Sequence, residues 1–396
     1  MSGCYKKRGK KSRRSLRMNE SPPILCVWAC TWTGLWQRHQ QLMSRLAAHH
    51  RILYVESPRD LFGLMRHWRQ FRWRQLFGGW EAAPNIVVFT PMVPFSLRRY
   101  PRLNRIWLML LRPWLRHLMR RWNCEQPILW VCYPPAEALV GGMGERLACY
   151  DCCDELADLS PRLARIIQEY EARLLSKVCL VFTSSETLFE KLAPYHGNVH
   201  LVPNGADVAH FAQASSGALV CPEELARLSH PLLGFVGAIQ QWVNIELLAE
   251  VARKRPAWQL ALIGSVHSDL ALLHDLPNVH ILGPKPYDQL PAYLAACDVC
   301  LIPFHLSPFV LACDPIKAYE YLAAGKPVVA TPIPRLRVFG DAIRVAEDAD
   351  GFIAQIEQAM ATENAAAAAG RLALALQHSW EKRVDDIEAA WRGLVE

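Results

Sequence analysis

Short apolar runs alternate with longer segments of helical periodicity along the first half of the chain. The expected strands of this half cover residues 24–30, 51–56, 85–91, 128–134, 147–154, 178–184 and 199–205. Between most of them, apolar side chains recur every three to four positions, which is the spacing of an amphipathic helix. Because apolar strands joined by helices are typical of parallel βαβ units, this half predicts an α/β domain.

The alternation breaks off around residues 205–225 and then starts again. A second set of expected strands covers residues 232–238, 258–264, 279–283, 299–304, 327–331 and 342–347. We predict an α/β protein of two Rossmann-like parallel-sheet domains, 22–210 and 211–378, which face each other across a cleft at the carboxyl ends of their strands. We expect residues 1–21 to be a basic disordered tail, and 379–396 to be an amphipathic helix that packs back toward the N-terminal domain.

The composition is that of a globular protein with reduced thiols. Of the 396 residues, 52% are apolar and 20% are charged, which argues against a disordered chain. No apolar run is long enough to span a bilayer, and the first residues lack the apolar core of a signal peptide. The 13 cysteines are scattered, and Cys149, Cys152 and Cys153 lack a second ligand pair at zinc spacing. We therefore expect a cytoplasmic location and no metal site.

The excess of basic charge is confined to the first residues. Residues 1–20 contain eight Lys or Arg and one acid, and their net +7 equals the net charge of the whole chain. Such a tail is typical of binding to anionic lipid or nucleic acid. Most of it also precedes Met18, an alternative start, so it carries little functional information.

Residues 59–125 are rich in arginine and tryptophan, with thirteen arginines, no lysine, three acids and six of the 14 tryptophans. One expected helical face there carries Trp107, Leu110, Trp114 and Leu118 beside arginines. Pro113 is expected to start or kink this helix. The pattern predicts contact with the cytoplasmic face of a bilayer. A core helix with solvated arginines is the main alternative, and single-stranded nucleic acid has no supporting motif, so we expect no nucleic acid.

The glycine-rich motifs of common nucleotide-binding enzymes are absent. No Gly-x-Gly-x-x-Gly follows the first strand, and GGMGER at 141–146 lacks the last glycine and the right position. In AAGKPVV at 323–329, Gly-Lys is followed by proline and leads into a strand rather than a helix. These patterns argue against a nicotinamide enzyme and a P-loop ATPase.

Two loops at expected strand ends carry residues suited to a nucleotide diphosphate. Gly237 and Ala238 end the first strand of the second domain and leave backbone N–H groups free to approach a phosphate. Pro315 fits the first turn of a helix, so Lys317 and nearby N–H groups are expected to face the cleft. Glu320 lies deeper and can accept two hydroxyl hydrogen bonds, which suits a ribose diol. The alternative for Glu320 is an ion pair with an arginine that only stabilises the fold.

Further candidate cleft residues lie beside these loops. Arg38 and His39 begin the first helix and can reach the cleft, although a solvated helix position is the alternative for His39. Ile316 shares the first helical turn with Pro315. Tyr319 is interpreted as a packing residue, with stacking on a nucleotide base as the alternative.

Seven segments follow one another in a characteristic order along residues 22–390. They are TWTGLWQRHQQLMSRLAAHHRILYVE, YDCCDELADL, SSETLFEKLAPYHGNVHLVPNGADVAHF, GFVGA, NVHILGPKPYDQLPAYLAACDVCLIPF, DPIKAYEYLAAGKPVVAT and HSWEKRV. In this order they resemble the GT-B glycosyltransferases, specifically the group 1, GT4-like family of sugar-nucleotide transferases. The Pro-Asn-Gly turn and the Glu…Ala-Ala-Gly-Lys-Pro-Val-Val segment are the most specific parts.

The resemblance implies a donor bound mainly by the C-terminal domain and an acceptor bound mainly by the N-terminal domain. Glu320 matches the glutamate that contacts the nucleotide ribose, and Gly34 and Gly237 match loops near the donor phosphates. Asp154 lies where the family often has a polar residue near the reacting sugar, as a catalytic or acceptor-orienting group. Capping of the next helix is the alternative for Asp154. Such family members are retaining hexosyltransferases that need no metal or cofactor besides the nucleotide-diphosphate sugar.

We therefore expect a cytoplasmic glycosyltransferase, peripheral on the inner face of the cell membrane. It would transfer a sugar to a saccharide or lipid-linked hydroxyl in surface polysaccharide or glycolipid synthesis. Two departures from the family pattern leave alternatives open. Ala312 stands where many relatives have a second glutamate, and GAIQQWVN at 237–244 lacks the Arg and Lys that many relatives have there. Lys317 is then the residue left to neutralise the diphosphate. The alternatives are a non-catalytic GT-B binding or scaffold protein and a sugar-nucleotide epimerase.

Overall fold

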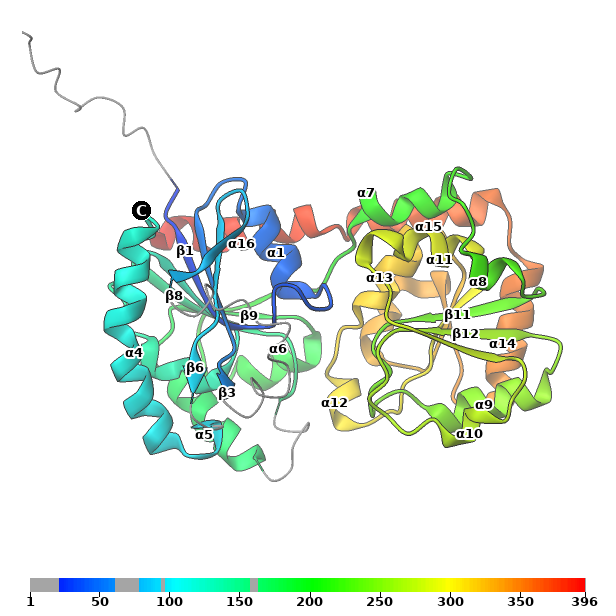
Figure 1. Ribbon diagram of the computed structural model, residues 1–396, viewed down its shortest axis with the longest axis horizontal. Helices are drawn as coiled ribbons and strands as arrows, with labels where there is room; N and C mark the ends of the chain where they lie inside the picture. Colours follow the sequence, from blue (N-terminus) through cyan, green and yellow to red (C-terminus); the bar gives the residue numbers. More distant parts are fainter. Residues whose placement is uncertain (1–20, 61–77, 94–96, 157–162, 396) are drawn as a thin grey trace, which may run out of the picture.

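The computed structural model describes residues 21–60, 78–93, 97–156 and 163–395, which form two α/β domains side by side (Figure 1). The N-terminal sheet has eight strands within these residues. In spatial order they are β10 (Val199–Leu201), β9 (Leu180–Thr183), β8 (Leu147–Cys152), β7 (Ile128–Val131), β1 (Ile24–Ala29), β2 (Ile52–Glu56), β5 (Ile86–Phe89) and β4 (Trp80–Ala83). All neighbours are parallel except β4 and β5, which pair antiparallel at the edge. A further short ladder joins β3 (Arg59–Asp60) to β6 (Met92–Val93).

The C-terminal sheet has six strands, all parallel. In spatial order they are β13 (Val279–Gly283), β12 (Gln259–Ile263), β11 (Leu232–Val236), β14 (Val299–Ile302), β15 (Val328–Ala330) and β16 (Ile343–Val345). In both sheets the first strand lies in the middle, where the direction of the crossovers reverses. Ligands of open parallel sheets bind at this reversal point, beyond the carboxyl ends of the strands. The prediction of two Rossmann-like domains facing across a cleft is thus confirmed.

Helices cover both sheets. The longer ones are α1 (Arg38–Leu46), α4 (Pro101–Arg121), α5 (Ala164–Leu175), α9 (Ile245–Lys254), α13 (Ile316–Ala323), α14 (Ala349–Ala361), α15 (Ala365–Gln377) and α16 (Trp380–Val395). The shorter ones are α6 (Glu186–Leu192), α7 (Val208–Phe211), α8 (Glu223–Ala226), α10 (Ala271–His274), α11 (Leu290–Ala296) and α12 (Pro308–Leu311). In the described part of the chain, no helix combines the length and apolar character needed to cross a membrane.

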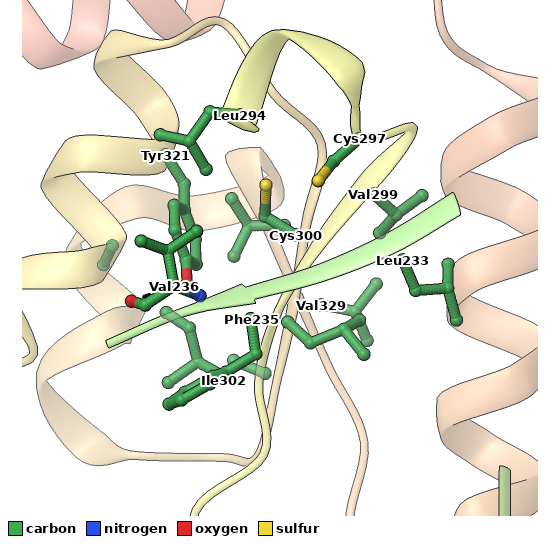
Figure 2. Packing of buried hydrophobic residues seen from close by; sticks show 14 of the residues in the cluster. Leu233, Phe235, Val236, Leu294, Cys297, Val299, Cys300, Ile302, Tyr321 and Val329 are labelled. Carbon is green, nitrogen blue, oxygen red and sulfur yellow. Dashed lines mark hydrogen bonds between the residues drawn. The ribbon is translucent and has the colours of Figure 1, made fainter. Parts of the chain in front are cut away.

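The core of the C-terminal domain surrounds β11, as Figure 2 shows. Leu233 and Phe235 lie among side chains of β14 and β15, and all are buried. Tyr321 of α13 reaches the end of the strand, where the Val236 N–H donates a hydrogen bond of 2.9 Å to its hydroxyl. This bond fixes α13 against the loop that follows β11, so the core sets the distance between the two elements that later form the site.

The chain crosses between the domains twice, at residues 204–206 and 378–380. The crossings pair side by side: the Ala206 N–H donates to the His378 carbonyl at 2.9 Å, and the Trp380 N–H donates to the Ala206 carbonyl at 3.1 Å. A Cβ on Gly205 would come within 2.9 Å of the His378 carbonyl oxygen, so only glycine fits this approach. After the second crossing, α16 packs against α1 of the N-terminal domain (Figure 1).

Candidate functional site

A cavity of about 380 Å³ lies between the two domains at the carboxyl ends of both sheets. The N-terminal domain contributes the loop after β1, the start of α1 and the loop after β8. The C-terminal domain contributes the loops after β11 and β14 and the start of α13. Nine of the ten predicted site residues line this cavity or an adjoining one of about 490 Å³, namely Gly34, Arg38, His39, Asp154, Gly237, Pro315, Ile316, Lys317 and Glu320.

Helix α13 points two charged side chains into this cavity. Pro315 caps the helix with φ −68°, and Lys317 and Glu320 follow three residues apart, so they share a face. Glu320 is only 8% exposed. Among the described residues, neither side chain has a hydrogen-bond partner or an ion-pair partner within 4.0 Å. Within the described residues, Glu320 therefore forms no ion pair with an arginine, contrary to the alternative of a purely structural role.

Burial disfavours the charge on both groups of α13. It raises the pKa of Glu320 to about 6, an effect that Lys317 partly offsets and Asp207 increases. Burial likewise lowers the pKa of Lys317, and Glu320 opposes this shift. The cost of burying each charge is thus offset only in part, by the opposite charge of the other residue. A ligand with phosphate oxygens next to Lys317 and hydroxyl groups next to Glu320 would supply the hydrogen-bond partners that these two side chains lack.

Gly237 lies directly against Lys317 where β11 ends. Its φ is +153°, which side-chain-bearing residues rarely adopt, and a Cβ there would collide with Cε and Nζ of Lys317. The Lys317 ammonium also lies 6.0 Å from the centre of the Phe235 ring. The lysine therefore occupies the space beside the β11 loop. The Gly237 N–H donates to the Ile263 carbonyl at 2.7 Å, so the expectation that it is free to approach a phosphate is wrong.

The residues 239–244 of the same loop add no cation to the cavity. Gln240 and Trp242 line it instead, and Trp242 packs against Phe309 with ring centres 5.2 Å apart. Ala312 is buried against the N-terminal core, and its carbonyl accepts a 2.6 Å hydrogen bond from the Ser185 hydroxyl. On this side the cavity is therefore lined by the rings of Trp242 and Phe309 and by Gln240, and Ala312 itself does not line it.

Arg38 holds the N-terminal side of the cavity together. Its Nε donates to both oxygens of Asp151 at 2.9 and 3.1 Å, and its Nη1 donates to Asn204 Oδ1 at 3.3 Å. Burial opposes the positive charge, but Asp151 outweighs it and raises the pKa of Arg38. Arg38 thus joins α1, β8 and the first crossing. Asp151 is fully buried as the partner of this arginine.

His39 and Asp154 face the cavity with little engagement elsewhere. Neither ring nitrogen of His39 has a hydrogen-bond partner among the described residues, and its Nε2 lies 4.0 Å from Asp151. Because His39 is buried, the solvated alternative for it is wrong. Burial raises the pKa of Asp154 to about 6, and a hydrogen bond from the Cys153 thiol opposes this. Helix α5 begins after Leu163 without a side-chain cap, so Asp154 does not cap it.

Tyr319 lies behind the cavity and does not line it. Its hydroxyl donates to Asp314 at 2.9 Å, and its ring packs edge-on against Phe339 and His378. A position two residues after Lys317 falls on the far side of a helix, which explains this orientation. These contacts agree with the interpretation of Tyr319 as a packing residue. The prediction that Tyr319 lies among the cleft residues was wrong, and so was the alternative that it stacks on a nucleotide base.

Sequence reasoning missed the residues that join the domains around the cavity. Asn204 donates from its backbone N–H to Asp314 Oδ2 and from its side chain to the Asp314 carbonyl, both at 2.6 Å. Across the adjoining cavity, Trp36 stacks on Tyr287 with ring centres 5.3 Å apart, and Gln41 donates to the Tyr287 hydroxyl at 2.8 Å. The Pro-Asn-Gly turn was the available signal for Asn204. The aromatic pair had none, because its members are 251 positions apart in the numbering, from 36 to 287.

Part of the chain is similar to proteins of a known family. Residues 230–362 match the family described as glycosyl transferases group 1. TuaH of Bacillus subtilis (strain 168), named for teichuronic acid biosynthesis as a glycosyltransferase, is 29% identical over 231 residues, or 54% of this chain. The match spans 57% of the length of that relative.

Solved structures are similar over nearly the whole chain. The E. coli trehalose-6-phosphate structure with bound UDP-2-fluoro glucose has a TM-score of 0.65 and 11% identity, covering 94% of this chain and 99% of the other. Anabaena Alr3699/HepE in complex with UDP and glucose has a TM-score of 0.63 and 15% identity, covering 94% and 100%. At such identities the likeness establishes the fold. The chain has the GT-B fold, and residues 230–362 of its C-terminal domain are similar to the group 1 glycosyl transferases.

Proposed function

We propose that this protein transfers a sugar from a nucleotide-diphosphate donor to a hydroxyl group of an acceptor. The observation that carries the proposal is the face of α13, where buried Glu320 and half-buried Lys317 line an interdomain cavity and have no hydrogen-bond or ion-pair partner among the described residues. A nucleotide diphosphate matches both groups. Glu320 accepts hydrogen bonds from the ribose diol, and Lys317, with the N–H groups at the start of α13, binds the diphosphate.

In the reaction, the bond between the sugar's anomeric carbon and the diphosphate oxygen breaks, and a bond from the acceptor oxygen to that carbon forms. The acceptor proton leaves with the diphosphate, whose developing negative charge Lys317 stabilises. This arrangement needs no metal or further cofactor. We propose retention at the anomeric carbon, in keeping with the family resemblance.

Asp154 is proposed to orient the acceptor hydroxyl from the N-terminal side. Its pKa of about 6 leaves the carboxylate largely ionised at neutral pH, so it can accept a hydrogen bond from that hydroxyl. His39 lines the same cavity and offers a second polar contact. The apolar wall of Trp242 and Phe309 suits the less polar face of a sugar ring.

The proposed acceptor is a saccharide, free or lipid-linked, used in surface polysaccharide or glycolipid synthesis on the cytoplasmic side of the cell membrane. The name of TuaH, which refers to teichuronic acid biosynthesis, supports this class of product. UDP is the first nucleotide to test, because the Anabaena structure contains UDP. A binding or scaffold protein without turnover is the second candidate, favoured by the loop 237–244 without a cation.

A thermal-shift screen of UDP, GDP, ADP, CMP and dTDP tests the donor site. One diphosphate should raise the melting temperature of the wild type by mass action and have no effect on Glu320→Ala. Glu250→Ala, on the exposed side of α9, is the matched control and should respond like the wild type. No shift with any nucleotide would contradict the proposal.

Turnover assays with the matching nucleotide sugar then separate the functions. Release of the diphosphate that depends on an acceptor identifies a transferase. Conversion of the sugar nucleotide without an acceptor identifies an epimerase. Binding without either reaction identifies the scaffold protein.

A further inference from the structure

The helix α4, at the outer edge of the N-terminal domain, presents two apolar faces instead of one. Leu108, Leu115 and Leu118 point inward and belong to the core. A second, exposed stripe consists of Leu103, Ile106, Met109, Leu110 and Trp114. Leu110 is 73% exposed and Ile106 is 55% exposed. Since a helix at the surface of a globular domain needs one apolar face for its core, the second face requires another partner.

The predicted face of this helix is divided in the structure. Leu118 is in the core and Trp107 packs on Trp28, whereas Leu110 and Trp114 are exposed. The expectation that Pro113 starts the helix is wrong, because α4 begins at Pro101 and continues through Pro113. The residues 61–77, also part of the arginine- and tryptophan-rich region, lie outside the described residues.

This accumulation of exposed apolar side chains is peculiar to α4 among the described helices. Five large apolar side chains are exposed on α4, whereas α10, α12, α15 and α16 expose one each, namely Leu272, Leu311, Leu376 and Leu394. Figure 1 shows α4 on the side of the domain that faces away from the C-terminal domain. Closure of the cleft therefore leaves the stripe uncovered.

The charges around the stripe are all of one sign. Helix α4 contains six arginines and no Asp or Glu. Arg112 and Arg116 donate to the carbonyls of Ala138 and Gly142 and so bind their own domain. Arg102 and Arg105 are exposed, and within the described residues no carboxylate lies within 4.0 Å of either. The surface thus combines apolar groups with free guanidinium groups, which bind phosphate in a bidentate manner.

We propose that this face of α4 docks on a bilayer of anionic phospholipids. The stripe enters the boundary between headgroups and acyl chains, Trp114 lies at the interface, and the arginines bind lipid phosphates. A second copy of the chain fits less well. In a two-fold contact through α4, arginines of both copies would face one another with no acidic residue on the helix to neutralise them.

Flotation of the full chain with vesicles tests this surface without any need for turnover. The vesicles contain phosphatidylglycerol and phosphatidylethanolamine in equal parts, and phosphatidylcholine vesicles serve as the neutral arm. The wild type should float with the anionic vesicles only. The double variant Ile106→Asp with Leu110→Asp should bind them at least about tenfold more weakly, because it loses apolar insertion and gains repulsion.

A matched control distinguishes vesicle binding through the α4 stripe from the effects of net charge and of the basic residues 1–20. Val220→Asp with Leu376→Asp adds the same two carboxylates at exposed apolar positions of the C-terminal domain and should float like the wild type. A second α4 variant, Arg102→Gln with Arg105→Gln, tests the phosphate contacts without altering the apolar stripe. It should bind about thirtyfold more weakly if each arginine contributes as surface cations usually do.

Three results would overturn the proposal. The first is a wild type that does not float with anionic vesicles. The second is equal binding by the Ile106→Asp, Leu110→Asp variant, or an equal loss in the matched control. The third is a wild-type dimer in light scattering that this α4 variant converts to a monomer, which would assign the stripe to a second copy. Unchanged melting temperatures of the variants confirm that the fold is intact.

Discussion

Helices α13 and α4 depart from ordinary surface amphipathicity in opposite ways. Helix α13 places two charged side chains, half-buried Lys317 and buried Glu320, in a cavity between the domains. Helix α4 exposes apolar side chains to solvent, with Leu110 the most exposed of them. In both helices the rest of the sequence follows the expected pattern and packs on its own sheet. We interpret each departure from amphipathicity as a sign of a binding partner outside the chain. For α13 this partner is a polar ligand, and for α4 it is an apolar phase.

The largest expected effect comes from removing the buried carboxylate. Glu320→Gln should weaken binding of the matching nucleotide by about a hundredfold, because two hydrogen bonds from the ribose to a charged group become neutral ones. The same variant should be more stable than the wild type at pH 7.5. The folded-state pKa of about 6 lies above the ordinary value of 4.5, so ionisation costs on the order of 2 kcal/mol above pH 6.

Calorimetric titration and thermal melting at two pH values measure the two effects of Glu320→Gln. The gain in stability should vanish at pH 4, where the carboxyl group is protonated in both states. If the variant lost both nucleotide binding and stability at pH 7.5, Glu320 would be a structural residue. That result would contradict the view that α13 differs from α4 by holding a carboxylate for a ligand.

Removing the cation should have the next largest effect. Lys317→Met keeps most of the apolar stem against Gly237 but removes the ammonium group, which we propose binds the diphosphate. We expect about thirtyfold weaker binding of the diphosphate and no change for the nucleoside, since the nucleoside lacks the phosphates. Titration of the two ligands against wild type and variant gives this ratio. Equal losses for both would mean that Lys317 shapes the cavity without binding phosphate.

Acidification should weaken nucleotide binding through Glu320. Its pKa of about 6 predicts about tenfold weaker binding at pH 5 than at pH 7, because only the ionised form accepts both hydroxyl groups. The dependence should be absent in Glu320→Gln. Titrations at several pH values measure it, and an identical profile in that variant would assign the titration to another group.

Gly237→Ala should destabilise the fold by about 1 kcal/mol through its positive φ and should displace Lys317. Gly283→Ala is the control, because its φ of +68° carries backbone strain while its Cβ would meet nothing within 4 Å. Only Gly237→Ala should also lose nucleotide binding. Denaturant melts and the thermal-shift screen distinguish the two, and equal binding by both variants would contradict the contact with Lys317.

The smallest effect on stability is expected on α4. Leu110→Asp should change the free energy of unfolding by no more than about 0.5 kcal/mol, because the side chain is already exposed. Leu115→Asp, one helical turn on but in the core, should prevent folding or cost several times more. Chemical denaturation measures the first, and a large loss for Leu110→Asp would mean that the stripe is covered by the protein itself.

Local pattern was enough for the elements and for the polar face of α13. The alternation of apolar strands with helices predicted both sheets, because burial on two faces leaves a continuous apolar run in each strand. Pro315, Lys317 and Glu320 could be placed on one helix because their spacing is local. The role of Tyr319 required the packed structure, since spacing alone does not say which side of a helix faces a neighbouring side chain such as Phe339.

The sequence by itself thus determined the fold class, the positions of most strands along the chain and the residues of α13. Only the tertiary structure decided that Arg38 binds Asp151 and Asn204, that Trp36 meets Tyr287, and that α4 carries a second apolar face. The physical reason is the range of the interactions. Periodicity reports contacts within one element, whereas a cavity between domains and the exposure of a face depend on which distant segments pack against each other.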